Sequence, residues 1–86
     1  MDMANMAERL ERKYGLGTNP DKSRGVYRTC ERLSNGPYAD QAYKIVCEVA
    51  VEADGKNQPG VWFRKTVMLR FREAGLLPTK PVLQPR

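Results

Sequence analysis

Histidine is absent from this 86-residue sequence, and cysteine occurs only twice, as Cys30 and Cys47. Without histidine the chain lacks the usual partner of a serine or cysteine nucleophile and the commonest general base near neutral pH. Two cysteines alone complete neither a four-ligand zinc site nor a disulfide scaffold, and we expect both to be small buried side chains. The sequence therefore predicts neither an enzyme nor a protein that holds a metal or another cofactor.

Long apolar runs are also missing, since stretches such as Val61-Trp62-Phe63 extend over only three residues. A helix that spans a bilayer needs about 20 consecutive apolar residues, so no membrane insertion is expected. Residues 1–13 mix acidic and basic side chains with methionine and lack the apolar core of a secretory signal. These features predict an unprocessed, intracellular and cytoplasmic protein, in which the cysteines stay reduced.

The length of the chain fits one small domain that buries roughly 60–65% of the surface of its unfolded state. With 41% hydrophobic and 29% charged residues, the chain should fold rather than stay disordered. Because so small a core is marginal, a partner or a homo-oligomer would stabilise it. We place the domain at residues 1–77 and an extended proline-rich tail at residues 78–86.

The net charge of +5 is distributed unevenly along the chain. Residues 1–36 have a net charge of +2, and residues 37–55 have a net charge of −3. Residues 56–86 hold seven basic side chains and one acidic side chain, which gives +6. The basic character, and any attraction to a polyanion, is therefore expected in the last third of the sequence.

The first periodic segment predicts an amphipathic helix over residues 2–14, followed by Gly15 as a helix stop. Its apolar residues recur at intervals of three and four and are Met3, Met6, Leu10 and Tyr14. One apolar stripe does not stabilise a helix of this length in isolation. We therefore expect the helix to dock, either on the rest of this chain or in a groove of a partner.

The next two segments are less clearly patterned. Residues 15–25 are rich in glycine, asparagine and proline and are interpreted as a linker. Residues 26–33 fit two structures, because helical spacing groups Val26, Cys30 and Leu33, whereas β-branched Val26 and Thr29 favour a strand. Residues 38–42 suit a short helix.

Residues 44–53 and 61–72 predict an antiparallel β-hairpin. The first run fits a helix and a strand equally well, but its β-branched residues favour the strand. In the second run a helical wheel scatters the basic side chains over the whole circumference, whereas alternate residues form one apolar face. With a loop at 54–60, Ala53 faces Val61 and Val51 faces Phe63, so the two apolar faces coincide.

The expected fold class is therefore α+β in one small domain. An N-terminal amphipathic helix and a second short helix would pack on the hairpin formed by 44–53 and 61–72, with the tail extending beyond it. Two strands alone are not stable, so the helices would have to complete the core.

The second predicted strand carries the candidate binding site. Alternation projects Trp62, Arg64, Arg70 and Arg72 to one side, where a stacking ring and guanidinium groups suit single-stranded nucleic acid. The candidate residues for binding nucleic acid or a partner are Trp62, Arg64, Lys65, Arg70, Arg72 and Lys80. Lys56 would extend the same basic field.

The opposing interpretation is structural. Trp62 would lie under the N-terminal helix, and Glu48 and Glu52 would form ion pairs with Arg64 and Arg70, leaving a solvated, salt-bridged face. Two functions remain open: a small nucleic-acid-associated protein, and an accessory or regulatory subunit. The subunit would dock on a larger complex with an acidic surface through its N-terminal helix, basic surface and proline-rich tail.

Overall fold

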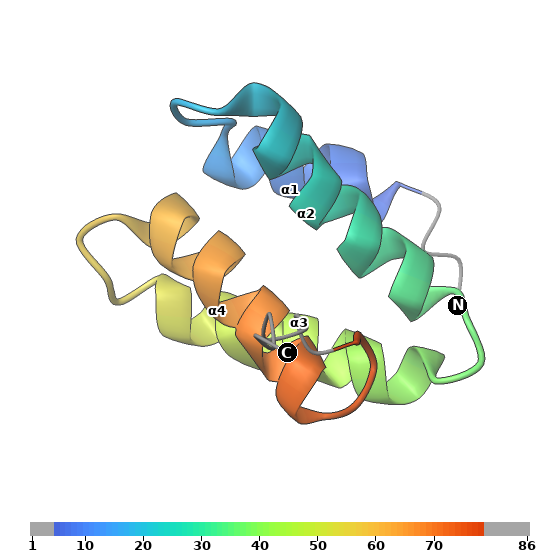
Figure 1. The fold of residues 1–86 in the computed structure, drawn as a ribbon. Helices are drawn as coiled ribbons and strands as arrows, with labels where there is room; N and C mark the ends of the chain where they lie inside the picture. Colours follow the sequence, from blue (N-terminus) through green and yellow to red (C-terminus); the bar gives the residue numbers. More distant parts are fainter. Residues whose placement is uncertain (1–4, 79–86) are drawn as a thin grey trace, which may run out of the picture.

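The structure is a computed structural model that describes residues 5–78. This part of the chain forms four helices, α1 (Met6–Tyr14), α2 (Pro20–Ser34), α3 (Ala39–Ala53) and α4 (Pro59–Glu73) (Figure 1). No strand occurs between residues 5 and 78. The predicted α+β class is therefore wrong, and the domain is all-α.

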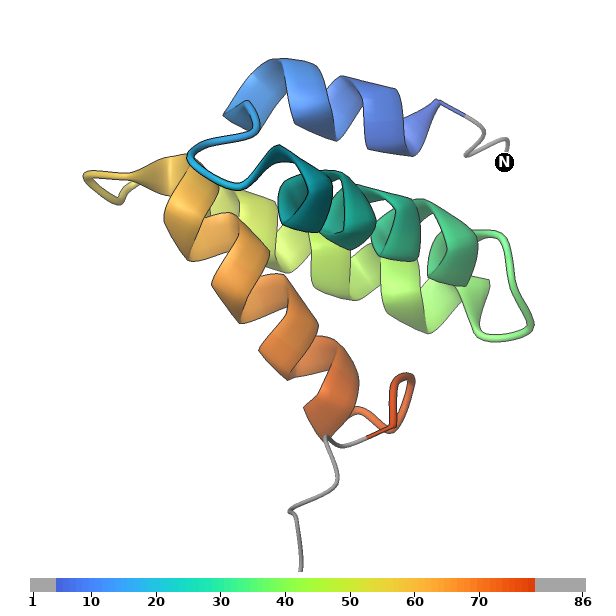
Figure 2. The ribbon, with the colours of Figure 1, turned by 45° about the horizontal axis from the view of Figure 1, so that its top comes forward.

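The helices pack in chain order. α1 packs on α2, α2 on α3 and α3 on α4, while α4 also contacts α1 and α2. In Figure 1, α2 and α4 lie in front of α1 and α3. Figure 2 shows that α1, α2 and α3 run roughly along one another, whereas α4 crosses them obliquely. This crossing brings the start of α4 next to the loop that joins α1 to α2.

Every helix contributes to one cluster of buried side chains. The buried hydrophobic residues are Met6, Leu10, Val26, Tyr27, Cys30, Ala42, Val46, Val49, Ala53, Phe63, Val67 and Phe71. Apart from the adjacent pair Val26 and Tyr27 on α2, these residues recur on each helix at intervals of three or four, which is the spacing of one helical face. The cluster is the core that the four helices share.

The α1 helix confirms the amphipathic helix predicted for this region, with a later start. Met6 and Leu10 are buried against the rest of the chain, so α1 docks within its own domain. The amide of Ala7 in the first turn donates a hydrogen bond to Glu31 Oε1 at 3.0 Å, which satisfies an otherwise free helical N–H group. Residues 2–4 of the predicted helix lie outside the described residues.

The α2 helix corrects the interpretation of residues 15–25 as a linker. Only residues 15–19 connect helices, because Asn19 caps α2 by accepting a hydrogen bond from the Lys22 amide and Pro20 occupies the first turn. Asparagine and proline act here as helix-start signals rather than as breakers. The ambiguity over residues 26–33 is also resolved, because the whole segment is helical.

The predicted hairpin of residues 44–53 and 61–72 is wrong, because both runs lie within helices that form an αα-hairpin. The short helix expected at 38–42 continues as α3 to Ala53. Strand preference of β-branched residues is weak, on the order of 0.5 kcal/mol per residue, and burial of one α3 face outweighs it. Pro59, interpreted as a turn residue, occupies the first turn of α4.

The scattered charges of α4 have a physical explanation. Only Phe63, Val67 and Phe71 need full burial, and they form one narrow stripe. Arg64 and Arg70 flank that stripe as half-buried side chains, because an arginine can bury its aliphatic stem while its charged end reaches a partner. A helical wheel that counts every arginine as exposed therefore hides the apolar face.

The α4 helix ends in a turn that returns the chain to the core. Gly75 has a φ of 79°, and the Leu76 amide donates a hydrogen bond to the Phe71 carbonyl at 2.9 Å. This pattern is that of a Schellman motif, in which a left-handed glycine closes the helix. Leu76 and Leu77 are half-buried and pack against the core. In the predicted tail, residues 79–86 lie outside the described part of the chain.

Candidate functional site

The predicted binding residues do not converge on one surface. Arg64 points into the junction of three helices, where its Nη1 donates to the carbonyl of Gly15 at 3.1 Å and to the hydroxyl oxygen of Tyr27 at 2.9 Å. The Tyr27 hydroxyl in turn donates to the Gly15 carbonyl at 2.6 Å. Arg64 thus joins α4 to α2 and to the end of α1, which gives it a structural role.

Close backbone packing surrounds the Arg64 junction. A Cβ atom at Gly60 would lie 2.7 Å from the Tyr14 carbonyl oxygen, and one at Gly17 would lie 2.8 Å from Arg64 Nη2. The rings of Tyr14 and Phe63 stack with centroids 4.5 Å apart. Burial raises the pKa of the Tyr14 hydroxyl. The junction therefore leaves no room for a ligand and serves to hold the helices together.

Arg70 is also engaged within the domain. Its Nη2 lies 3.2 Å from Glu52 Oε1 on α3, an ion pair between two of the four side chains that were expected to pair, although on helices rather than strands. The pairing predicted for Arg64 with a carboxylate is not found among residues 5–78. Neither arginine is therefore available in the way the sequence interpretation required.

The remaining predicted residues divide into two groups. Trp62 is half-buried, and Lys56 Nζ lies 5.0 Å from the centroid of its ring, a cation–π contact that occupies one ring face. Lys65 is exposed and Arg72 is half-buried, and neither forms an ion pair with a carboxylate in the described part of the chain. Lys80 lies outside the described residues.

The structure shows a row of basic side chains on α2 that was not predicted from the sequence. Arg24, Arg28 and Arg32 follow one another at intervals of four residues on the exposed side of the helix, and Lys22 lies near its start. The spacing is a signal that the sequence contains, but the interpretation of 15–25 as a linker separated Arg24 from the others. A helix must cover residues 24–32 without a break to place the three arginines in one row, and α2 does so.

Most of this row is free of acidic partners. Arg24 Nε lies 3.6 Å from Glu11 Oε1 across the α1–α2 contact, while Lys22, Arg28 and Arg32 form no ion pair with any carboxylate of residues 5–78. Only Asp21 adds a negative charge at the exposed side of α2 near its start. The outer side of α2 is therefore strongly positive.

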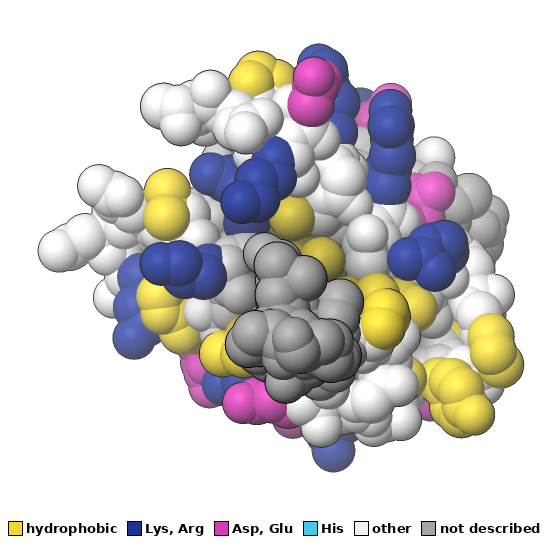
Figure 3. All heavy atoms as spheres, in the orientation of Figure 1, with side chains coloured by type: hydrophobic (Ala, Val, Ile, Leu, Met, Phe, Trp, Pro, Cys, Tyr) yellow, Lys and Arg dark blue, Asp and Glu magenta, His cyan; other side chains and the backbone are white. Residues whose placement is uncertain are grey.

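We give the name basic face to the basic side chains on the outer sides of α2 and α4, of which Arg72 is half-buried and the others are exposed. It comprises Lys22, Arg24, Arg28, Arg32, Lys65 and Arg72. Figure 3 shows the side of the molecule on which α2 and α4 lie in front. Basic side chains occur across both helices, with apolar side chains between them. The exposed side of α3 differs, because it carries Asp40, Glu48 and Glu52 and one lysine, Lys44.

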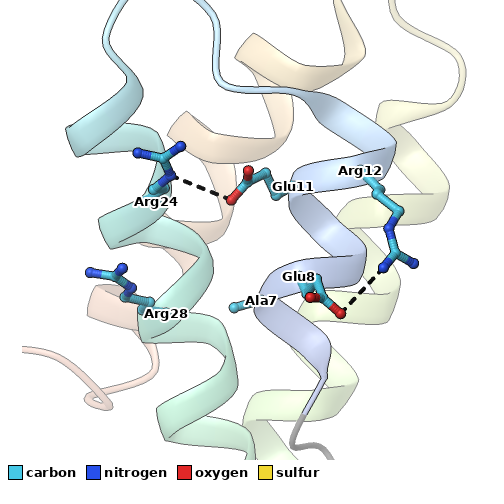
Figure 4. Close-up of a pocket in the computed structure, with 6 residues that line it drawn as sticks. All are labelled: Ala7, Glu8, Glu11, Arg12, Arg24 and Arg28. Carbon is cyan, nitrogen blue, oxygen red and sulfur yellow. Dashed lines mark hydrogen bonds and ion pairs between the residues drawn. The ribbon is translucent and has the colours of Figure 1, made fainter.

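A shallow groove of about 440 Å³ lies between α1 and α2. It is lined by Ala7, Glu8, Glu11, Arg12, Arg24 and Arg28 (Figure 4). Four of its charged side chains form two ion pairs, Arg12 with Glu8 at 3.3 Å and Arg24 with Glu11 at 3.6 Å. The groove combines no nucleophile with a base, so its residues offer charge but no evident chemistry.

The two cysteines differ from each other. Cys30 is fully buried, as predicted, and desolvation raises the pKa of its thiol to about 12, which makes it unreactive. Cys47 is exposed, so its predicted burial is wrong. The strand interpretation placed Cys47 on the apolar face, whereas the helix turns it to the outer side of α3. Within residues 5–78 no group of three potential ligands could hold a metal ion.

No helix in the described part of the chain is long and apolar enough to cross a membrane. Comparison of the chain with protein-family models, with curated proteins and with solved structures finds no match. The functional argument therefore depends on the residues and geometry of this chain alone.

Proposed function

We propose that this chain is a small basic, non-enzymatic binding protein that associates with nucleic acid through the basic face of α2 and α4. The observation that carries the proposal is the row of exposed basic side chains on α2, most of which have no acidic partner among residues 5–78. The proposal moves the contact surface from the predicted Trp62 and Arg64 region to α2. Lys65 and Arg72 of the predicted set remain part of it.

Charge complementarity supports a phosphate-rich partner. A nucleic-acid backbone carries a dense row of negative charges, and each phosphate neutralised by lysine or arginine releases condensed counterions. Arginine also forms bidentate hydrogen bonds with phosphate, which an exposed and unpaired guanidinium can supply. The affinity of the basic face for nucleic acid should therefore fall steeply as salt rises.

A charge-matched pair of variants tests this proposal. Arg28→Glu reverses a charge on the basic face, and Lys44→Glu makes the same change in net charge on the outer side of α3. We expect Arg28→Glu to weaken binding of a fluorescent oligonucleotide about tenfold or more at about 50 mM salt, and Lys44→Glu to change it about twofold at most. Fluorescence polarisation measures both affinities.

Two results of that titration would contradict the proposal. Wild-type protein that binds neither single- nor double-stranded nucleic acid at low salt would exclude the function. Equal weakening by the two variants would show that net charge alone, and not the basic face, governs the affinity. Circular dichroism should confirm that both variants keep the helical content of the wild type.

The second candidate function is an accessory or regulatory subunit of a larger complex. The observation that favours it is that Val51 on α3 is 72% exposed and Tyr38 just before α3 is 65% exposed, so both side chains are open to contact by a partner. The α1 helix supports this candidate less strongly than the sequence suggested, because its apolar residues Met6 and Leu10 are buried within the domain and not free to enter a groove of a partner. Under either function we propose a cytoplasmic location, where nucleic acid and large complexes are both present.

A further inference from the structure

Gly25 is a glycine that the packing of α2 does not explain. It lies well inside the helix, on its exposed side, and its φ is not in the left-handed region. A Cβ atom built at this position meets nothing within 4 Å. Since glycine disfavours a helix relative to alanine, this position lowers the stability of α2 without a gain in the packing of the domain.

The surroundings of Gly25 give the glycine a use. On a helix surface the neighbours of a residue lie three and four positions away, which here are Asp21, Lys22, Arg28 and Thr29. The Thr29 hydroxyl donates to the Gly25 carbonyl at 2.8 Å, so this side chain is held close to the helix. The result is a low point in the basic face, with Lys22 on one side, Arg28 on the other and the exposed carboxylate of Asp21 one turn before it.

We infer that Gly25 marks the point at which α2 lies directly against the sugar-phosphate backbone of a nucleic-acid duplex. This inference rests on the proposed function and adds the class of nucleic acid and the contact point. Glycine allows the close approach of a ligand to the helix backbone. Lys22 and Arg28 can then reach phosphates on both sides of the contact. A longer side chain at position 25 would keep the nucleic-acid backbone away from the helix.

The geometry of the basic face favours a duplex over a single strand. From Arg24 to Arg32 the row extends over about 12 Å of rigid helix, and a duplex presents its phosphates in an equally rigid array. Single strands are held largely by exposed aromatic rings. Tyr27, the aromatic residue of α2, is 1% exposed, and Trp62 is half-buried with Lys56 over its ring.

Substitution of Gly25 separates stability from binding. Gly25→Gln adds a neutral side chain that favours helix, so we expect a higher Tm together with an affinity for duplex that is lower by about tenfold. The matched control is Val51→Ala on α3, which also favours helix and lies outside the basic face. It should raise Tm and leave the affinity unchanged. The probe is a labelled duplex of about 20 base pairs, longer than the molecule, beside a single strand of the same length.

The outcomes distinguish this inference from the proposed function. No binding of either probe by the wild type would overturn both. If Arg28→Glu weakens binding but Gly25→Gln has the same affinity as the Val51→Ala control, the proposed function stands and the role of Gly25 is overturned. Tighter binding of the single strand than of the duplex would overturn the assignment of the duplex. Loss of duplex affinity on Gly25→Gln, with Tm raised, would support the inference.

Discussion

Gly60 sets how closely the start of α4 can approach the end of α1. A Cβ atom at residue 60 would lie 2.7 Å from the carbonyl oxygen of Tyr14 and 3.2 Å from Nη1 of Arg64. The atom in closest contact belongs to backbone, which cannot move aside as a flexible side chain can. This single position therefore couples the placement of α4 to that of α1.

Substitution of Gly60 by alanine should destabilise the domain by about 2 kcal/mol, because the helices must separate to admit a methyl group. The control is Gly25→Ala, where open space and a helical φ predict a gain of about 0.5–1 kcal/mol. Urea unfolding followed by circular dichroism gives both free energies of unfolding. Equal effects of the two substitutions would show that the contact at Gly60 does not limit packing.

Individual arginines show what a sequence can and cannot reveal about this site. The pairing of Arg70 with Glu52 was only partly predictable, because the sequence identified both side chains as candidates for ion pairs but the predicted hairpin register placed Arg70 opposite Lys44. The role of Arg64 was not predictable, because its partners Gly15 and Tyr27 are 49 and 37 residues away and one of them is a backbone carbonyl. No pattern of residue types identifies a backbone carbonyl as a partner.

At the scale of the element, the start of α2 depends on a small number of polar contacts. Asn19 accepts a hydrogen bond from the Lys22 amide at 3.2 Å, and Ser23 Oγ donates to the Leu16 carbonyl at 2.6 Å. The cap fixes where the helix begins, whereas burial of Val26, Tyr27 and Cys30 fixes the side of α2 that faces outward.

Asn19→Ala should lower the stability of the domain by about 1 kcal/mol, since it leaves an N-terminal amide of α2 without its side-chain acceptor. Asn57, which is exposed in the loop between α3 and α4, provides the control. Its substitution by alanine should change the stability by less than about 0.5 kcal/mol. Thermal unfolding of the two variants measures the difference, and an equal effect would contradict the capping role.

The elements differ in how far the sequence could predict them. The α1 helix was predictable because its stripe is regular and Gly15 ends it. The α3 and α4 helices were not predictable. In α3, Ile45, Val49 and their neighbours fit the period of a helix and that of a strand equally well, and in α4 the scattered charges hide the apolar face. Tertiary burial decides such cases, and it brings the four helices together in a way that no single segment specifies.

At the scale of the whole molecule, the basic face and the acidic outer side of α3 make the domain electrically asymmetric. The row on α2 is intact only when the helix is complete, so the candidate site is a property of the fold. The sequence located the positive charge in its last third, whereas the fold also exposes a basic row on α2, at Arg24, Arg28 and Arg32. Charge counted by segment misses this row because residues 1–36 also hold five acidic side chains, which lower the net charge of that segment to +2.

The shared core also links global stability to pH through Cys30. Desolvation raises the pKa of its thiol to about 12 from an ordinary value of 9.0, so the folded state holds a proton that the unfolded state loses. The stabilising contribution is complete below about pH 9 and is lost as pH rises toward about 12. The slope is at most about 1.4 kcal/mol per pH unit.

The free energy of unfolding should therefore fall by about 2 kcal/mol between about pH 8 and about pH 10.5. Cys30→Ala removes the titrating thiol, so it should lower stability near pH 8 but give a flatter profile. Tyr14, whose pKa is also raised by burial, would leave a smaller decline at the alkaline end. Val51→Ala is the control, because that exposed side chain carries no titrating group and its loss should leave the slope unchanged. Urea unfolding across this range measures the three profiles, and a decline in Cys30→Ala as steep as in the wild type would exclude Cys30 as its source.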